Sequence, residues 1–150
     1  MVNLNFIGKV KNSVNELVDD NWGSIESEIV LNHEYANGLR NLDSFSHAII
    51  IFYMDKSDFD ISKDLVRRPR GRSDLPEYGI FAQRAKHRPN PIGITTVKII
   101  KVQNNILTVK GLDAINETPI IDIKPYFKVF DNIENYKQAN WVDDIMKDYF

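Results

Sequence analysis

The sequence predicts a mainly β fold, an antiparallel barrel or sandwich that carries a few short helices. Three observations lead to this prediction. About five to seven short segments are rich in β-branched and aromatic residues, turn-forming residues separate them, and few stretches have a helical period. The 150 residues match the size of one domain, so we expect residues 1–150 to form a single domain.

The predicted strands run through the whole chain. Residues 48–53 form an unbroken β-branched and aromatic run, typical of a central strand that is buried on both faces. Residues 95–102 and 106–109 predict a hairpin, with its turn at Gln103-Asn104-Asn105. The other predicted strands are 6–10, 25–31, 80–82 and 119–123, and Pro125 ends the last of them.

Two helices and one long loop complete the expected elements. Asn32 is placed to cap a short helix that ends near Leu39. In residues 139–150, Trp141, Ile145 and Tyr149 are four apart, which predicts an amphipathic C-terminal helix. Residues 55–77 have no period and many arginines, and loops of that length are usually functional or disordered.

Composition and missing motifs exclude several classes of protein. The chain has no cysteine, which rules out disulfides and cysteine nucleophiles and suits a reducing cytosol. No apolar run is long enough to span a bilayer and no signal peptide is evident, so we expect a cytoplasmic protein. The dinucleotide-binding turn, the phosphate loop and the serine elbow are all absent. The three histidines are far apart, so we expect no metal.

Basic residues are concentrated in one part of an acidic chain. The net charge is −2, yet residues 63–88 contain eight basic and three acidic residues. Such a segment suggests phosphate or RNA as a partner. The candidate phosphate-binding side chains are Arg67, Arg68, Arg70 and Arg72. The alternative is a solvated loop without a partner.

The segment Arg84-Ala85-Lys86-His87-Arg88-Pro89-Asn90-Pro91-Ile92-Gly93 is stiffened by its two prolines. Each proline restricts the residue before it, so Arg88 and Asn90 are expected to be extended. A rigid loop of this kind can present donors to a carboxylate, a phosphate or a base edge. The alternative is a stiff turn whose arginines cap neighbouring carbonyls.

Three polar residues stand close to predicted strands near the end of the chain. Asp122 and Lys124 share one face of a strand, and Asp113 follows the strand before it. A carboxylate cluster suits a bound cation or a proton-transfer step. The alternative for Asp122 and Lys124 is an exposed ion pair that contributes little.

Several motifs in this order resemble the TsaA-like (TrmO-type) family over residues 6–126. They are Leu42-Asp43-Ser44-Phe45-Ser46-His47, Gly79-Ile80-Phe81-Ala82-Gln83-Arg84, His87-Arg88-Pro89-Asn90-Pro91-Ile92-Gly93, Gly111-Leu112-Asp113, and Thr118-Pro119 through Asp122-Ile123-Lys124-Pro125-Tyr126. The resemblance implies a small antiparallel β-barrel that binds S-adenosyl-L-methionine. It also implies a homodimer with the cofactor site near the interface, and N6-methylation of threonylcarbamoyl-modified adenosine beside the tRNA anticodon.

The resemblance also places the functional residues. It assigns the cofactor contacts to Arg84, Ile94, Lys110, Gly111, Leu112, Asp113, Asp55 and Lys56. Asn21, Trp22 and Gly23 stand where relatives often have a loop with proline and glutamine, and they are assigned by position. Longer members have a further C-terminal domain that is absent from this sequence.

The reaction that the resemblance implies is methyl transfer to nitrogen, which depends mainly on alignment of the reactants. We expect Asp122 and Lys124, or Asp113, to act in catalysis, and the arginines, His87 and Asn90 to bind the RNA substrate. The alternatives are methyl transfer to another small-molecule or protein nitrogen, a non-catalytic RNA-binding barrel, and a purely structural dimer module.

Overall fold

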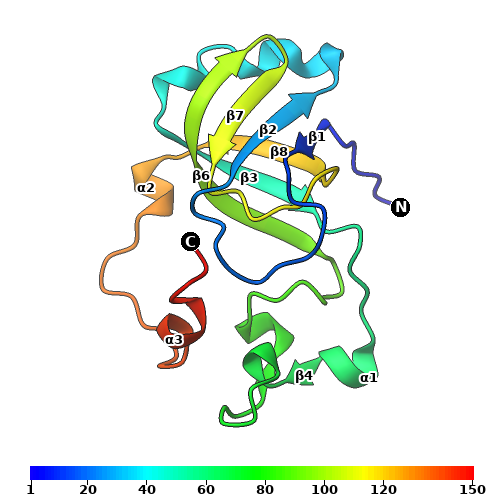
Figure 1. The fold of residues 1–150 in the computed structure, drawn as a ribbon, viewed down its shortest axis with the longest axis vertical. Helices are drawn as coiled ribbons and strands as arrows, with labels where there is room; N and C mark the ends of the chain where they lie inside the picture. The colour runs from blue at the N-terminus through cyan, green and yellow to red at the C-terminus, as the bar shows by residue number, and fades with distance from the viewer.

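Six strands close into an antiparallel barrel in the computed structural model, which describes residues 1–150 (Figure 1). Their order around the barrel is β1-β2-β7-β6-β3-β8, and β8 returns to pair with β1. The strands are β1 (Gly8–Lys11), β2 (Glu26–Leu31), β3 (His47–Tyr53), β6 (Ile92–Gln103), β7 (Ile106–Lys110) and β8 (Pro119–Pro125). The barrel alternative is therefore confirmed, and the sandwich is not formed.

The barrel interior is filled by the inward-facing residues of all six strands. The core includes Val10, Ile29, Ile50, Val97 and Ile120, each at most 1% exposed. These residues follow the alternation that a strand with one buried face requires. Burial of a side chain of this size contributes about 1.5–3 kcal/mol.

The sequence correctly predicts the strand positions but not every local structure. The hairpin of β6 and β7 turns at Asn104, whose φ of 54° is of the left-handed kind that asparagine tolerates. The predicted strand at 80–82 is wrong, because these residues form the 3₁₀ helix η4 (Ile80–Ala82). Only Ile80 of the three is buried, and its amide donates to the Leu65 carbonyl, so the segment turns instead of extending a sheet.

Short 3₁₀ helices η1 (His33–Leu39) and η2 (Leu42–Ser44) connect β2 to β3. The helix predicted after Asn32 is present, but it is 3₁₀ and Asn32 does not cap it. The Asn32 amide donates instead to the Phe6 carbonyl at 3.2 Å, which fixes the N-terminal segment to the end of β2.

Residues 55–91 are more ordered than a free loop. They contain α1 (Ile61–Asp64), β4 (Val66–Arg67), η3 (Pro69–Gly71) and β5 (Tyr78–Gly79), and β4 pairs with β5 in a separate two-stranded ladder. In Figure 1 this segment hangs below the barrel, next to the C-terminal helix α3 (Val142–Met146). The loop between β1 and β2 descends from the barrel toward this lower part, and most of its residues are exposed.

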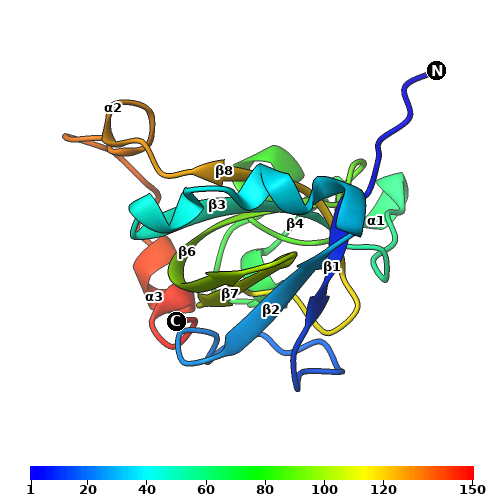
Figure 2. The same cartoon turned by 90° about the horizontal axis from the view of Figure 1, so that it is seen from above.

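The C-terminal region has two short helices, α2 (Lys128–Asp131) and α3. Figure 2 shows α2 projecting from the barrel while α3 lies against the body. The predicted stripe is confirmed in part, since Trp141 and Ile145 are buried, but the helix ends at Met146, well before Phe150. Beyond the helix, the carbonyls of Asp148 and Tyr149 accept hydrogen bonds from the amides of Asn21 and Trp22.

Candidate functional site

The Asp113 carboxylate joins strand β6 to the C-terminal segment. Thr95 of β6 donates its hydroxyl to one carboxylate oxygen, and Tyr149 from the C-terminal segment donates its hydroxyl to the other. Asp113 follows β7 through Gly111, whose φ of 91° is readily adopted only by glycine. We call Asp113, Thr95, Tyr149, Arg70 and Arg84 the Asp113 cluster.

The two arginines supply positive charge to the Asp113 cluster. The Arg70 guanidinium lies 6.0 Å from the centre of the Tyr149 ring. Arg84 donates to the carbonyl of Ile94 at 3.0 Å, and the charges of both arginines act against the rise in the Tyr149 pKa. Burial is the main cause of that rise, followed by the Asp113 carboxylate, so the Tyr149 hydroxyl stays protonated and able to donate.

The loop with Asn21, Trp22 and Gly23 reaches the same region by way of the chain end. The Asn21 amide donates to the Asp148 carbonyl and the Trp22 amide to the Tyr149 carbonyl, both at 2.8 Å. Trp22 is 3% exposed, and Asn21 has a φ of 69°. The structure therefore places this loop beside the Asp113 cluster.

The remaining candidate cofactor residues are distributed around the ends of the barrel strands. Lys110, at the end of β7, lies opposite Glu26 of β2 and Lys98 of β6 in the strand register. Leu112 is fully buried, so its side chain belongs to the core. Asp55 and Lys56 are exposed in the turn that follows β3. The Met54 amide donates to the Pro91 carbonyl, which places that turn at the start of β6, near Ile94.

Most of the candidate RNA-binding arginines already have partners within the chain. Arg67 pairs with Asp64 at 3.1 Å, and Arg70 pairs with Asp20 at 3.1 Å. Arg72 pairs with both Asp74 and Asp144, so it joins the lower segment to α3, and this pairing lowers the Asp74 pKa. These carboxylates compensate the charges that the sequence suggested were free for phosphate.

Arg68 and Arg88 differ from these three because carbonyls, not carboxylates, hold them. Arg68 donates to the Leu75 carbonyl, and Arg88 donates to the carbonyls of Gln83 and Ala85 at 2.8 and 3.1 Å. The carbonyl-capping arrangement considered for the proline-rich segment is thus present at Arg88. A guanidinium held by carbonyls keeps its full positive charge.

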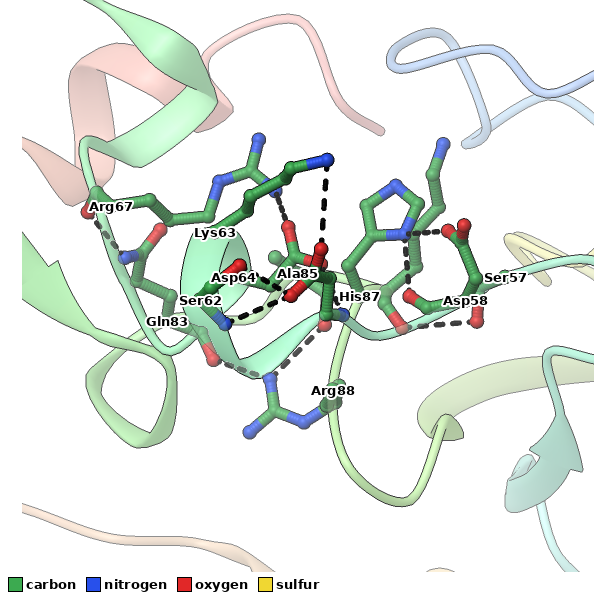
Figure 3. A network of polar contacts seen from close by, with 12 residues as sticks. Ser57, Asp58, Ser62, Lys63, Asp64, Arg67, Gln83, Ala85, His87 and Arg88 are labelled. Carbon is green, nitrogen blue, oxygen red and sulfur yellow. Dashed lines mark hydrogen bonds and ion pairs between the residues drawn. The ribbon is translucent and has the colours of Figure 1, made fainter.

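Hydrogen bonds join the loop after β3, at Ser57 and Asp58, to the loop before β6, at residues 83–88 (Figure 3). His87 contacts the backbone oxygen and the carboxylate of Asp58, and Ser57 donates to the Lys86 carbonyl at 3.1 Å. The buried Gln83 donates to the carbonyls of Arg67 and Tyr78, which supports the β4–β5 ladder. Asn90 is exposed, and its carbonyl accepts from the Ile92 amide.

Asp122 and Lys124 form an ion pair of 2.7 Å on the outer face of β8. Their side chains are 43% and 60% exposed, and Asp122 raises the Lys124 pKa. A bulge shifts the register between β3 and β8 beside Ile121, so Asp122 faces outward as predicted while Ile121 has no partner on β3. The pair lies on the barrel surface and outside the Asp113 cluster.

Two residues of the Asp113 cluster were missing from the sequence prediction. Thr95 is a hydroxyl residue at a buried strand position, and buried hydroxyls need a partner. Tyr149 is the third member of the C-terminal stripe and has a polar tip on an apolar ring. These two signals are visible in the sequence, although neither indicates which carboxylate they bind.

The structure contains neither a metal-binding group nor a helix that could span a membrane. No three histidine, aspartate or glutamate side chains come together as a metal-binding group. None of the helices is both long and apolar enough to cross a bilayer.

Residues 20–132 match the family of the tRNA-methyltransferase O N-terminal domain. The chain belongs to this family. The matched region contains the loop at Asn21, Arg84 and Asp113, but it ends before α3 and Tyr149.

Curated relatives agree with this membership. The chain is 38% identical over 117 residues to a probable S-adenosyl-L-methionine-binding protein of Archaeoglobus fulgidus, covering 78% of this chain and 30% of that protein. It is 36% identical to another from Pyrococcus abyssi, over 79% of this chain and 61% of that one. A human tRNA (adenine(37)-N6)-methyltransferase is 37% identical over 74% of this chain and 24% of its own length.

The chain thus spans less than two thirds of each of these three relatives. Among solved structures, TrmO from Pseudomonas aeruginosa superposes with a TM-score of 0.74 at 23% identity, covering 93% of this chain and 62% of that one. This likeness shows that the two chains share the barrel fold.

Proposed function

We propose that this member of the TrmO N-terminal domain family is an S-adenosyl-L-methionine-dependent methyltransferase. The proposed acceptor is N6 of the threonylcarbamoyl-modified adenosine beside the tRNA anticodon. The observation that carries the proposal is the Asp113 cluster, where the Tyr149 hydroxyl binds the carboxylate, Arg70 lies beside the Tyr149 ring, and Arg84 binds the carbonyl of Ile94 next to Thr95. Its similarity to a probable S-adenosyl-L-methionine-binding protein and to a tRNA (adenine(37)-N6)-methyltransferase supports it.

The residues present suit the proposed cofactor. A guanidinium such as that of Arg84 pairs with a carboxylate, and the Asp113 carboxylate accepts from an ammonium or a ribose hydroxyl. The point that a Cβ on Gly111 would occupy is open, two residues before Asp113 in the chain. The bound cofactor would supply a methyl group on a positively charged sulfur.

The chain itself would contribute alignment and proton transfer. Placing the reactants in line accounts for most of the acceleration expected in a displacement at carbon. The acceptor nitrogen must lose a proton, and Asp122 is the exposed carboxylate on the barrel surface that we assign to this role, with Lys124 holding it in place. Asp113 is the alternative, although both of its oxygens already accept hydrogen bonds.

The basic segment is the proposed RNA surface. Arg68 and Arg88 are its leading members because no carboxylate compensates them, and Asn90 and His87 lie in the same lower part. A phosphate can engage Arg67, Arg70 or Arg72 only by competing with Asp64, Asp20, Asp74 and Asp144. Single-stranded loops such as the anticodon loop suit such a surface.

We also propose that the chain forms a cytoplasmic homodimer through the outer face of β6. Ile92 and Ile94 are 41% and 49% exposed on this face, two residues apart and therefore on the same side. Arg84 binds the Ile94 carbonyl, so an interface here would border the Asp113 cluster.

Calorimetry with S-adenosyl-L-methionine is the direct test of this proposal. Binding at one molecule per chain, followed by methyl transfer to a tRNA pool and recovery of N6-methylated modified adenosine, would support it. Transfer to a different nitrogen would favour the alternative acceptor. Binding of RNA by the folded chain without any binding of the cofactor would favour the non-catalytic RNA-binding barrel.

A further inference from the structure

The C-terminal segment is firmly attached to the body of the protein. Trp141 and Ile145 are 7% and 8% exposed, and the Trp141 ring packs edge-on against Tyr78 at 5.1 Å between ring centres. The ion pair between Arg72 and Asp144 adds a link to the lower part of the molecule. Helix α3 is therefore held in place, and residues 147–150 continue from its end.

From that point the segment runs along the loop that precedes β2. The carbonyls of Asp148 and Tyr149 accept from the amides of Asn21 and Trp22. A Cβ on Gly23 would lie 2.5 Å from the carbonyl carbon of Phe150, so this contact requires glycine at position 23. The loop at Asn21–Gly23 and residues 148–150 therefore pack closely against each other.

This attachment brings the Tyr149 hydroxyl to Asp113. Thr95 holds one carboxylate oxygen and Tyr149 holds the other, so both oxygens have a fixed partner. An ionised carboxylate has about four acceptor positions, so roughly two remain for a ligand. Groups that lock a binding carboxylate in one orientation lower the ordering cost of binding.

We propose that Tyr149 is a positioning residue for the cofactor site, orienting Asp113 through its hydroxyl while residues 148–150 support the loop at Asn21–Gly23. This inference rests on the proposed function. Residues 133–150 lie beyond the part of the chain that matches the family, so the family match assigns no role to them. The C-terminal segment is then a component of the binding site that lies outside the barrel strands.

The test is a double-mutant cycle on cofactor affinity, measured by calorimetry. Tyr149→Phe removes the hydroxyl and keeps the ring, and we expect S-adenosyl-L-methionine to bind about tenfold more weakly, the effect of one charge-assisted hydrogen bond. In the Asp113→Asn background, Tyr149→Phe should have almost no further effect. Tyr136→Phe is the matched control, because Tyr136 is 71% exposed, and it should leave the affinity unchanged.

Several outcomes would overturn the inference. Additive losses in the cycle would show that Tyr149 does not act through Asp113. Tighter binding by Tyr149→Phe would show that the hydroxyl competes with the cofactor for the carboxylate. If the native chain binds the cofactor and only the cycle fails, the inference alone is wrong. If the folded native chain does not bind it, the proposed function fails, and the inference fails with it.

A second variant tests the support of the loop by residues 148–150. Gly23→Ala should displace Phe150, speed hydrogen exchange at the Asn21 and Trp22 amides, and weaken cofactor binding about tenfold, as Tyr149→Phe does. Gly38→Ala is its control, because no atom lies within 4 Å of the added Cβ. Faster exchange with native affinity would show that the segment supports only the fold.

Discussion

Asp122 of β8 and Ile94 of β6 lie in one row across the barrel surface, because each pairs with Ile51 of β3. Two strand spacings separate them, which corresponds to about 10 Å. Arg84 binds the carbonyl of Ile94, so this row connects the ion pair of Asp122 with the Asp113 cluster. A ligand that reaches from Arg84 across Ile51 would bring an acceptor near Asp122.

Asp122→Asn tests the assigned proton acceptor. We expect methyl transfer to slow by about 10²–10⁴-fold, the usual contribution of a general base, with cofactor affinity unchanged. The thermal midpoint should hardly move because the ion pair with Lys124 is exposed. Single-turnover rates measure the effect, and Glu28→Gln, an exposed carboxylate on β2, is the control. Native turnover in Asp122→Asn would remove Asp122 from this role.

A comparison of variants at Arg68 and Arg72 distinguishes an arginine that contacts RNA from one that is paired within the chain. Arg68→Gln should weaken binding of an anticodon stem-loop and reduce the slope of log affinity against log salt by about one. Arg72→Gln should keep that slope, because Asp74 and Asp144 already neutralise Arg72. Titrations at several salt concentrations compare the two variants. Equal losses of slope would show that phosphate displaces the carboxylates.

Tyr149 should make the protein sensitive to alkali. Its pKa is raised in the folded chain by burial and by the Asp113 carboxylate, so above about pH 10 the unfolded chain loses this proton before the folded chain does. Tyr149 stabilises the fold fully below that pH, and its contribution decreases as the pH rises further. Between about pH 8 and 11, the free energy of unfolding measured in urea should fall less steeply with pH in Tyr149→Phe than in the native chain. Identical slopes would contradict this assignment.

Gly93 is required by the contact between β6 and β3. A Cβ at Gly93 would lie 2.4 Å from the ring of its cross-strand partner Phe52, which is 3% exposed. Gly93→Ala should therefore lower the free energy of unfolding by about 1–3 kcal/mol. Gly38→Ala, with open space around the new methyl group, should be close to neutral. Denaturant unfolding of both variants measures the difference.

Ile94→Lys tests the proposed dimer. A charge placed in an apolar interface is costly to bury, so the variant should be monomeric in sedimentation experiments while keeping its far-ultraviolet circular dichroism. Glu28→Lys places a lysine on another barrel face, reversing a charge there, and should leave the oligomeric state unchanged. A native chain that is monomeric at all concentrations would contradict the proposal.

The sequence alone determined which segments become strands and where the main hairpin turns. Alternating apolar residues and the Asn104 turn are local signals, and the strands appear where those signals lie. The motifs around Arg84 and Asp113 likewise indicate the family from local sequence alone, and the family is confirmed. The apolar run at 80–82 carried a misleading local signal, since only Ile80 found a place in the interior.

Only the tertiary structure decided which polar groups are free and which are paired. Arg70 meets Asp20, Arg72 meets Asp144, and Asp113 meets Tyr149, across separations in sequence that no periodicity describes. Charge and hydrogen-bonding capacity belong to single residues, but compensation of a charge requires a partner at contact distance. Barrel closure and the docking of the chain end bring these partners together, so the site emerges only in the folded chain.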